Sequence, residues 1–274
     1  MTHPEKPVPR DQLEAVERLI QIVDTLRSPG GCPWDAKQTV ESLTPHLLEE
    51  CHELADAVAR RDDPGTREEL GDLLMGVLMV SRVAAEDRGY GLPEVAGGIS
   101  DKLIRRHPHV YGEVVVADEG EVLSNWEAIK KLEKQDAGQD DTSALSGVPS
   151  SLPALLRAYR VGQKAANTGF DWPDLLGPAE KVDEEWAELQ DAIARDDRQE
   201  AEHEIGDLLF AIVNMARKLE IEPELALRGT IERFSSRFRH IERNLGKPFG
   251  EATLEEMDAL WDQAKEAESC SPQA

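Results

Sequence analysis

A pattern of four acidic residues occurs twice in this chain, and it constrains the fold more than any other feature. The first acid and the final aspartate are 22 residues apart in both copies (72 − 50 and 207 − 185), and each aspartate lies in a Gly-Asp-Leu-Leu string. A pattern repeated with the same internal spacing predicts a duplicated structural unit. The acids of the two copies are Glu50, Glu53, Glu69 and Asp72, and Glu185, Glu188, Glu204 and Asp207.

The spacing within each copy predicts a pair of helices with facing carboxylates. Residues three apart lie on the same face of a helix, as Glu185 and Glu188 do in this pattern. Acids on helices are most often part of a solvated surface, but here they border apolar residues, because Leu54 follows Glu53 and Leu189 follows Glu188. Buried carboxylates repel one another unless a cation lies between them, so the pattern indicates a Mg²⁺-type site.

Composition and periodicity favour an all-α protein. Charged residues make up 31% of the chain and aromatic residues 5%, and apolar residues recur at helical spacing in the first helix, at residues 13–26. Thr44-Pro45 reads as the start of a second helix, which ends at the turn of residues 62–65. We expect two four-helix domains, at 1–136 and 152–274, joined by a Gly-, Asp-, Ser- and Thr-rich linker at 137–151.

The net charge indicates which binding partners are unfavourable, and the cysteines indicate the cellular compartment. A formal net charge of −24 and a pI near 4.6 argue against a nucleic-acid partner or an anionic membrane surface. The three cysteines have no CxxC spacing, which is typical of a reduced cytosolic chain. The first ten residues lack the apolar segment of a signal peptide, and no apolar run reaches the ~20 residues that span a bilayer. We therefore expect a cytoplasmic protein.

A ferritin-like di-iron site is the competing metal interpretation. Such sites use Glu-x-x-His pairs on the helices of one bundle. Glu49 and His52 form one pair of this kind, and Glu200 and His203 form another. The two pairs occupy different positions in the two repeats, so we regard a di-iron site as the weaker hypothesis.

The ordered motifs resemble the MazG-type nucleoside triphosphate pyrophosphohydrolases, which are all-α proteins. The acid spacing carries this resemblance over nearly the whole chain, as two tandem copies. Three further strings support it: Gly31-Cys32-Pro33-Trp34-Asp35, residues 105–110, and Gly169-Phe170-Asp171-Trp172. The resemblance implies hydrolysis of nucleoside triphosphates to NMP and pyrophosphate, with Mg²⁺, or Mn²⁺ in its place, and with broad nucleotide range. A narrow dUTPase-like enzyme and a non-catalytic helical interaction module are the alternatives.

The resemblance also assigns roles to individual residues. It places the metal on Glu185, Glu188, Glu204 and Asp207, with a second site at the acids of the first repeat. Glu185 holds the ion that activates water, and either Glu184 or Glu204 orients or deprotonates that water. The residues expected to bind the substrate are Lys181, Trp172, Asn214, Arg233 and Arg237.

The surroundings of the acids differ between the repeats. Asn214 lies seven residues after Asp207, whereas Met79 occupies the equivalent position after Asp72. An amide at this position can hydrogen-bond a ribose or a base, and a thioether cannot do so comparably. We therefore expect the second domain to be the catalytic one. Each domain leaves an apolar face that its own helices do not cover, so we also expect a homodimer.

Overall fold

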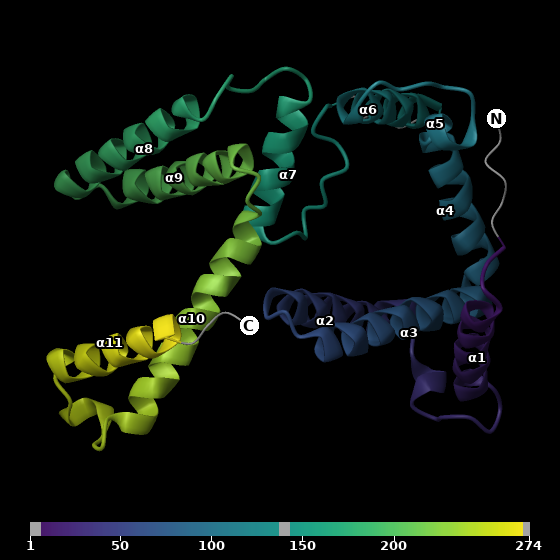
Figure 1. Ribbon diagram of the computed structural model, residues 1–274, viewed down its shortest axis with the longest axis horizontal. Coiled ribbons are helices and arrows are strands. Elements are labelled where there is room, and N and C mark those ends of the chain that lie inside the picture. Colours follow the sequence, from purple (N-terminus) through teal and green to yellow (C-terminus); the bar gives the residue numbers. More distant parts are fainter. Residues whose placement is uncertain (1–6, 137–142, 271–274) are drawn as a thin grey trace. The chain divides into compact units, whose positions relative to one another are not determined.

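The computed structural model describes residues 7–136 and 143–270, and within these ranges all regular structure is helical (Figure 1). This confirms the predicted all-α class. The chain divides into two compact units, Met1–Asp140 and Asp141–Ala274. The predicted linker begins in residues 137–142, which lie outside the described part of the chain.

The first unit is built around a pair of long helices. α2 and α3 pack along each other, α1 and α4 contact α3, and α6 contacts α4. Its elements are α1 (Arg10–Arg27), η1 (Asp35–Lys37), α2 (Val40–Ala59), α3 (Asp63–Asp87), α4 (Leu92–Arg106), α5 (Pro108–Tyr111) and α6 (Glu119–Asp136).

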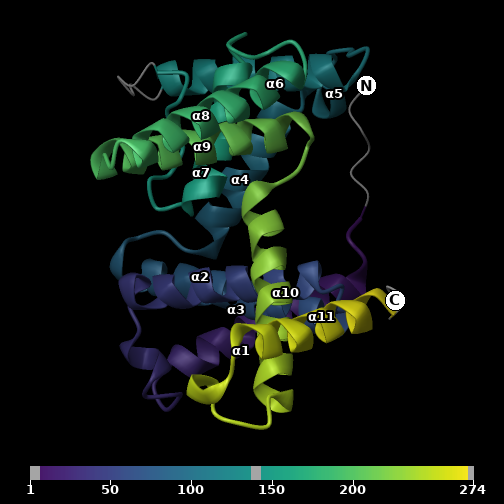
Figure 2. The same cartoon turned by 90° about the vertical axis from the view of Figure 1, so that its left-hand side faces the viewer.

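The second unit repeats the helix pair. α8 and α9 lie side by side in both views (Figures 1 and 2), α7 packs against α9, and α10 leads away from this pair to contact α11. Its elements are α7 (Ala154–Ala166), α8 (Leu176–Ala194), α9 (Arg198–Lys218), α10 (Pro223–Asn244), η2 (Phe249–Glu251) and α11 (Leu254–Cys270).

The two helix pairs turn in the same way. Arg61 and Asp196, which are 135 residues apart (196 − 61), both have φ of 54° in the turn between the helices. The next residue caps the following helix in each case, since Asp62 accepts a hydrogen bond from the Gly65 amide and Asp197 accepts one from the Glu200 amide. We call α2–α3 and α8–α9 the two hairpins. Their matching turns set the acids of both repeats in the same register.

Apolar side chains from α1, α2 and α3 form the core of the first unit. Val23, Leu43, Leu78, Met79 and Val83 are all buried in it. Met79 is therefore a core residue, and Asn214 occupies the equivalent position of the second unit, where it is also buried. The difference between methionine and asparagine thus falls at an interior position of each unit.

Two helix starts differ from those predicted. α2 begins at Val40, before Thr44-Pro45, because the side chains and backbone amides of Thr39 and Ser42 cap each other there. Pro45 lies within the helix. α6 begins at Glu119, five residues before Ser124, where the sequence pattern predicts the start of a short helix. α11 is a further helix that the sequence pattern does not predict. In the described part of the chain, no helix is long and apolar enough to span a membrane.

Candidate functional site

The α8–α9 hairpin brings three of the predicted acids together. Glu185 comes from α8, and Glu204 and Asp207 come from α9. One carboxylate oxygen from each lies within 4.8 Å of the others. Glu185 and Glu204 are only 4% and 6% exposed, whereas Asp207 faces solvent. We call Glu185, Glu204 and Asp207 the second-repeat acid cluster. Buried carboxylates at this separation form a place where a divalent cation is electrostatically favoured.

Glu204 is the least satisfied member of this cluster. Its Oε2 atom is buried and has no hydrogen-bond partner. Burial raises the pKa of Glu204, and the negative charges of Glu188 and Glu185 raise this pKa further. Glu188 follows Glu185 by three residues on α8, so it lies on the same face of that helix. A hard cation would satisfy the unpaired oxygen and relieve the repulsion, so the residues present fit a metal ion with oxygen ligands.

Lys181 supplies positive charge to the same site. Its Nζ atom lies 2.5 Å from Oε1 of Glu185 and 3.1 Å from Oε1 of Glu184. These contacts, with that to Glu185 the stronger, raise the pKa of Lys181 well above its usual range. Lys181 therefore carries its charge throughout the neutral pH range and offsets part of the acidic field.

The first repeat keeps the acids but changes this cation. Oxygen atoms of Glu50, Glu53 and Glu69 lie within 4.8 Å of one another. Burial is the main cause that raises the pKa of Glu50, and the charge of Asp72 follows. The position equivalent to Lys181 holds His46 (181 − 135), which lies 3.7 Å from Glu49. The first repeat therefore has an imidazole where the second repeat has the ammonium group of a lysine.

The other predicted residues have different partners. Asn214 is buried, and its amide donates to the Phe210 carbonyl while its oxygen accepts from Nε of Arg217. Arg233 donates to the Thr230 hydroxyl. Arg237 donates to Glu268 of α11 at 2.7 Å and 3.0 Å, and its guanidinium lies over the Trp261 ring. The contacts described for the second unit thus join Lys181 to the acid cluster and direct these three side chains elsewhere.

Trp172 lies in the loop between α7 and α8. Contacts of Asp171 with Arg217 and Lys218, which the sequence did not predict, hold this loop, and we call them the Asp171 network. Asp171 accepts hydrogen bonds from Arg217 at 2.5 Å and 3.1 Å and lies 2.8 Å from Nζ of Lys218. Lys218 also donates to the Trp172 carbonyl. These contacts, led by those of Arg217, lower the pKa of Asp171 far below its ordinary value. The Asp-Trp pair in this loop was visible in the sequence. Nothing in the residue spacing, however, indicates its contacts with Arg217 and Lys218, which are 46 positions later.

Both hairpins fall within regions that match a protein-family model. The model describes the MazG nucleotide pyrophosphohydrolase domain, and it matches residues 38–111 and 179–242. The first match contains all four acids of the first repeat, and the second contains Lys181 and all four acids of its repeat. The duplication predicted from the acid spacing is thus confirmed as two domains of one family.

Whole-chain relatives agree with this result. A nucleoside triphosphate pyrophosphohydrolase from Escherichia coli is 42% identical over 93% of this chain and 99% of its own length. A nucleoside triphosphate pyrophosphohydrolase/pyrophosphatase MazG from Thermotoga maritima is 41% identical over 91% of this chain and 95% of its own.

A solved structure of a MazG-related protein, also from Thermotoga maritima, is 34% identical. It covers 42% of this chain and 98% of its own, with a TM-score of 0.38. The family assignment depends on the sequence matches and on the two acid-bearing hairpins. On these grounds the chain belongs to the MazG nucleotide pyrophosphohydrolase family.

Proposed function

We propose that this protein hydrolyses nucleoside triphosphates between the α and β phosphates, releasing NMP and pyrophosphate, and that Mg²⁺ in the second unit is required. One observation carries the assignment of the metal to this unit: the buried, unpaired Oε2 atom of Glu204 lies in a cluster of carboxylates within 4.8 Å. The family and the activity named for the relatives from Escherichia coli and Thermotoga maritima support the reaction.

The acids of the α8–α9 hairpin would hold the ion. Glu185, Glu204 and Asp207 already converge, and Glu188 is near enough to raise the pKa of Glu204. Oxygen ligands alone suit Mg²⁺, and Mn²⁺ is the natural substitute. A bound ion would neutralise phosphate oxygens and favour ionisation of the attacking water.

Lys181 and Glu184 would assist the reaction in this proposal. Once a cation satisfies Glu185, the ammonium group of Lys181 becomes available to the phosphates of the substrate. Glu184 lies outside the converging acids, is exposed, and touches Lys181 at 3.1 Å. A carboxylate free of the metal can accept a proton from water, whereas Glu204 is occupied as a ligand. We therefore favour Glu184 over Glu204 as the general base.

The nucleoside would be bound mainly by stacking. Trp172 is half-buried, and the Asp171 network fixes its backbone. Stacking of a base on an aromatic ring tolerates every base, because each base has a π-face. This tolerance is the reason for proposing broad nucleotide range rather than dUTPase-like selectivity. In this proposal Asn214 supports the Trp172 loop through Arg217, which also holds Asp171.

A homodimer is also part of the proposal, because both hairpins leave equivalent apolar residues exposed. Three residues on α9 at spacings of four and three are exposed by 40–49%, and their counterparts 135 residues earlier on α3 are exposed by 40–52%. Apolar residues in such a stripe mark a surface that another helix covers. The two stripes consist of Ile205, Leu209 and Ile212, and of Leu70, Leu74 and Val77.

The decisive experiment measures pyrophosphate and NMP release with Mg²⁺ from a panel of NTPs and dNTPs. Glu185→Gln should reduce kcat/KM by more than about 100-fold, since it removes a ligand that stabilises transition-state charge, and Glu50→Gln should leave most activity. If Glu50→Gln inactivates the enzyme and Glu185→Gln does not, the catalytic unit is the first one. Failure of the wild type to release pyrophosphate from any nucleotide would refute the enzyme proposal. Light scattering tests the dimer directly.

A further inference from the structure

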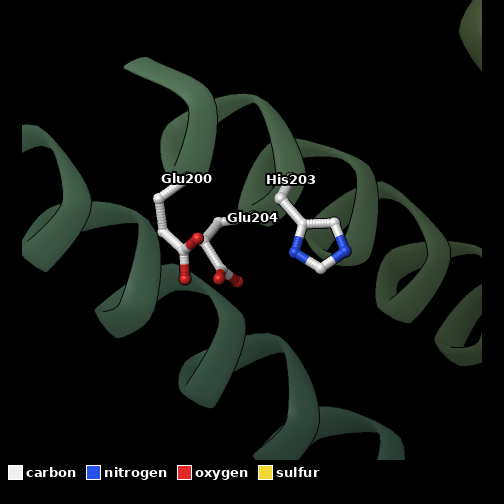
Figure 3. A group of neighbouring side chains, drawn as sticks. All are labelled: Glu200, His203 and Glu204. Carbon is white, nitrogen blue, oxygen red and sulfur yellow. The ribbon is translucent and has the colours of Figure 1, made fainter. Parts of the chain in front are cut away.

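We propose that α9 carries a second cation position, built by Glu200, His203 and Glu204 for a divalent first-row transition metal. A nitrogen of His203 and one carboxylate oxygen from each glutamate lie within 4.8 Å of one another. The three residues stand at spacings of three and four, so they leave one face of the helix together. Figure 3 shows the two carboxyl groups close together, with the imidazole ring beside them.

Glu204 is the buried member of this group, and its unpaired oxygen is open to a ligand. It is 6% exposed, and its Oε2 atom has no hydrogen-bond partner. Glu204 belongs both to this group and to the second-repeat acid cluster. A carboxylate has two oxygens with about four lone-pair sites. One side chain therefore has enough acceptor sites to bind two neighbouring ions.

The imidazole distinguishes this position from the Mg²⁺ site. Imidazole nitrogen suits Zn²⁺, Co²⁺ and other first-row ions, whereas Mg²⁺ prefers oxygen ligands alone. One nitrogen and two oxygens provide three protein ligands and leave a coordination position open to solvent. His203 and Glu200 are exposed and line an open depression together with Asp207, so an ion can reach them. Nε2 of His203 also lies 3.7 Å from Oδ2 of Asp207.

The first repeat lacks this ligand set. The residues 135 positions before Glu200 and His203 are Gly65 and Glu68. Glycine offers no side-chain ligand and Glu68 offers only oxygen, although Glu69 corresponds to Glu204. Two of the three proposed ligands, Glu200 and His203, therefore lie outside the acid pattern that both repeats share, and the first repeat is an internal comparison that lacks the histidine.

Calorimetric titration of the full, untagged protein with Zn²⁺ tests the proposal, in excess Mg²⁺ and without nucleotide. Loss of a direct ligand should weaken Zn²⁺ binding at least as much as loss of a supporting partner does, about 10- to 100-fold. We expect that loss in His203→Gln. The matched control is His46→Gln, because His46 is also an exposed helical histidine near a glutamate, and it should bind Zn²⁺ as the wild type does.

Co²⁺ absorption spectra supply the second readout. A nitrogen-bound Co²⁺ ion gives visible bands whose position and intensity should change in His203→Gln and stay unchanged in His46→Gln and Glu185→Gln. If Zn²⁺ and Co²⁺ binding survive His203→Gln, or fail in Glu185→Gln while His203→Gln binds normally, the ion uses the second-repeat acid cluster and the proposal is wrong. No turnover enters these measurements, so their result is independent of the proposed function.

Discussion

The Asp171 network should stabilise the second unit by a measurable amount. The side chains of Asp171, Arg217 and Lys218 are 22%, 10% and 18% exposed, so the ion pairs are only partly screened. Hydrogen bonds to charged groups contribute about 1.5–3 kcal/mol when buried, and exposed ion pairs contribute about 0–1 kcal/mol. Because the Asp171 contacts are partly buried, Asp171→Asn should lower the free energy of unfolding by about 1–2 kcal/mol at pH 7. Urea denaturation of wild type and variant, followed by tryptophan fluorescence, measures this difference.

The pH dependence of that difference is the sharper test. Because Arg217 and Lys218 lower the pKa of Asp171 in the folded protein, the stabilisation is complete above the unfolded pKa of about 3.9. It is lost as the pH falls through the lower folded pKa. The gap in unfolding free energy between wild type and Asp171→Asn should therefore stay constant from pH 7 to about 5 and shrink below about 4.

The control variant lies in the same loop. Asp174 accepts a backbone hydrogen bond from Leu176 as Asp171 does from Trp172, and asparagine can accept either bond. Asp174→Asn should therefore leave stability within about 0.5 kcal/mol of the wild type. Equal losses in the two variants would show that the ion pairs contribute nothing. So would a double-mutant cycle of Asp171→Asn with Arg217→Gln that yields no coupling energy.

Three further predictions concern the hairpins and the Trp172 loop. Burial and neighbouring acids raise the pKa of Glu204, so without metal the stability falls as the pH rises through the folded pKa of this group. Glu204→Gln should therefore raise the metal-free melting temperature more at high pH than at low pH and should reduce the gain from Mg²⁺. Scanning calorimetry with EDTA or Mg²⁺ measures both effects. In Gly177→Ala the new Cβ would lie 2.1 Å from Cδ1 of Trp172 and would displace that ring, so KM for nucleotides should rise several-fold. The control is Gly71→Ala, whose new Cβ has nothing within 4 Å. It should stabilise the protein by about 1 kcal/mol and leave KM unchanged. Ile205→Glu should shift the light-scattering mass toward the monomer, while Leu227→Glu on α10, also exposed, should not.

The sequence was sufficient where local rules determine the structure. Helical class, duplication and the converging acids all follow from spacings within one helix or across one short turn, and Lys181 contacts Glu185 as its i,i+4 position predicts. The start of α2 was missed because the Thr39 and Ser42 cap gives a better beginning than Pro45. Asp171, Arg217 and Lys218 were missed because only the packing of the α7–α8 loop against α9 brings them together, and no short-range pattern records that contact.

The clustered carboxylates also make the stability of the two hairpins depend on the ions around them. In each hairpin, the apolar contacts and the turn hold the two helices together, while the like charges of the acids push them apart. An ion that binds only the closed form adds RT ln(1 + [ion]/Kd) to its stability, about 2.7 kcal/mol at one hundred times Kd. Resistance to local opening, measured by hydrogen exchange along α8 and α9, should therefore increase with the logarithm of free divalent ion concentration. The stability of the α8–α9 hairpin would thus report the concentration of free divalent ions, in addition to the hairpin's role in positioning the metal ligands.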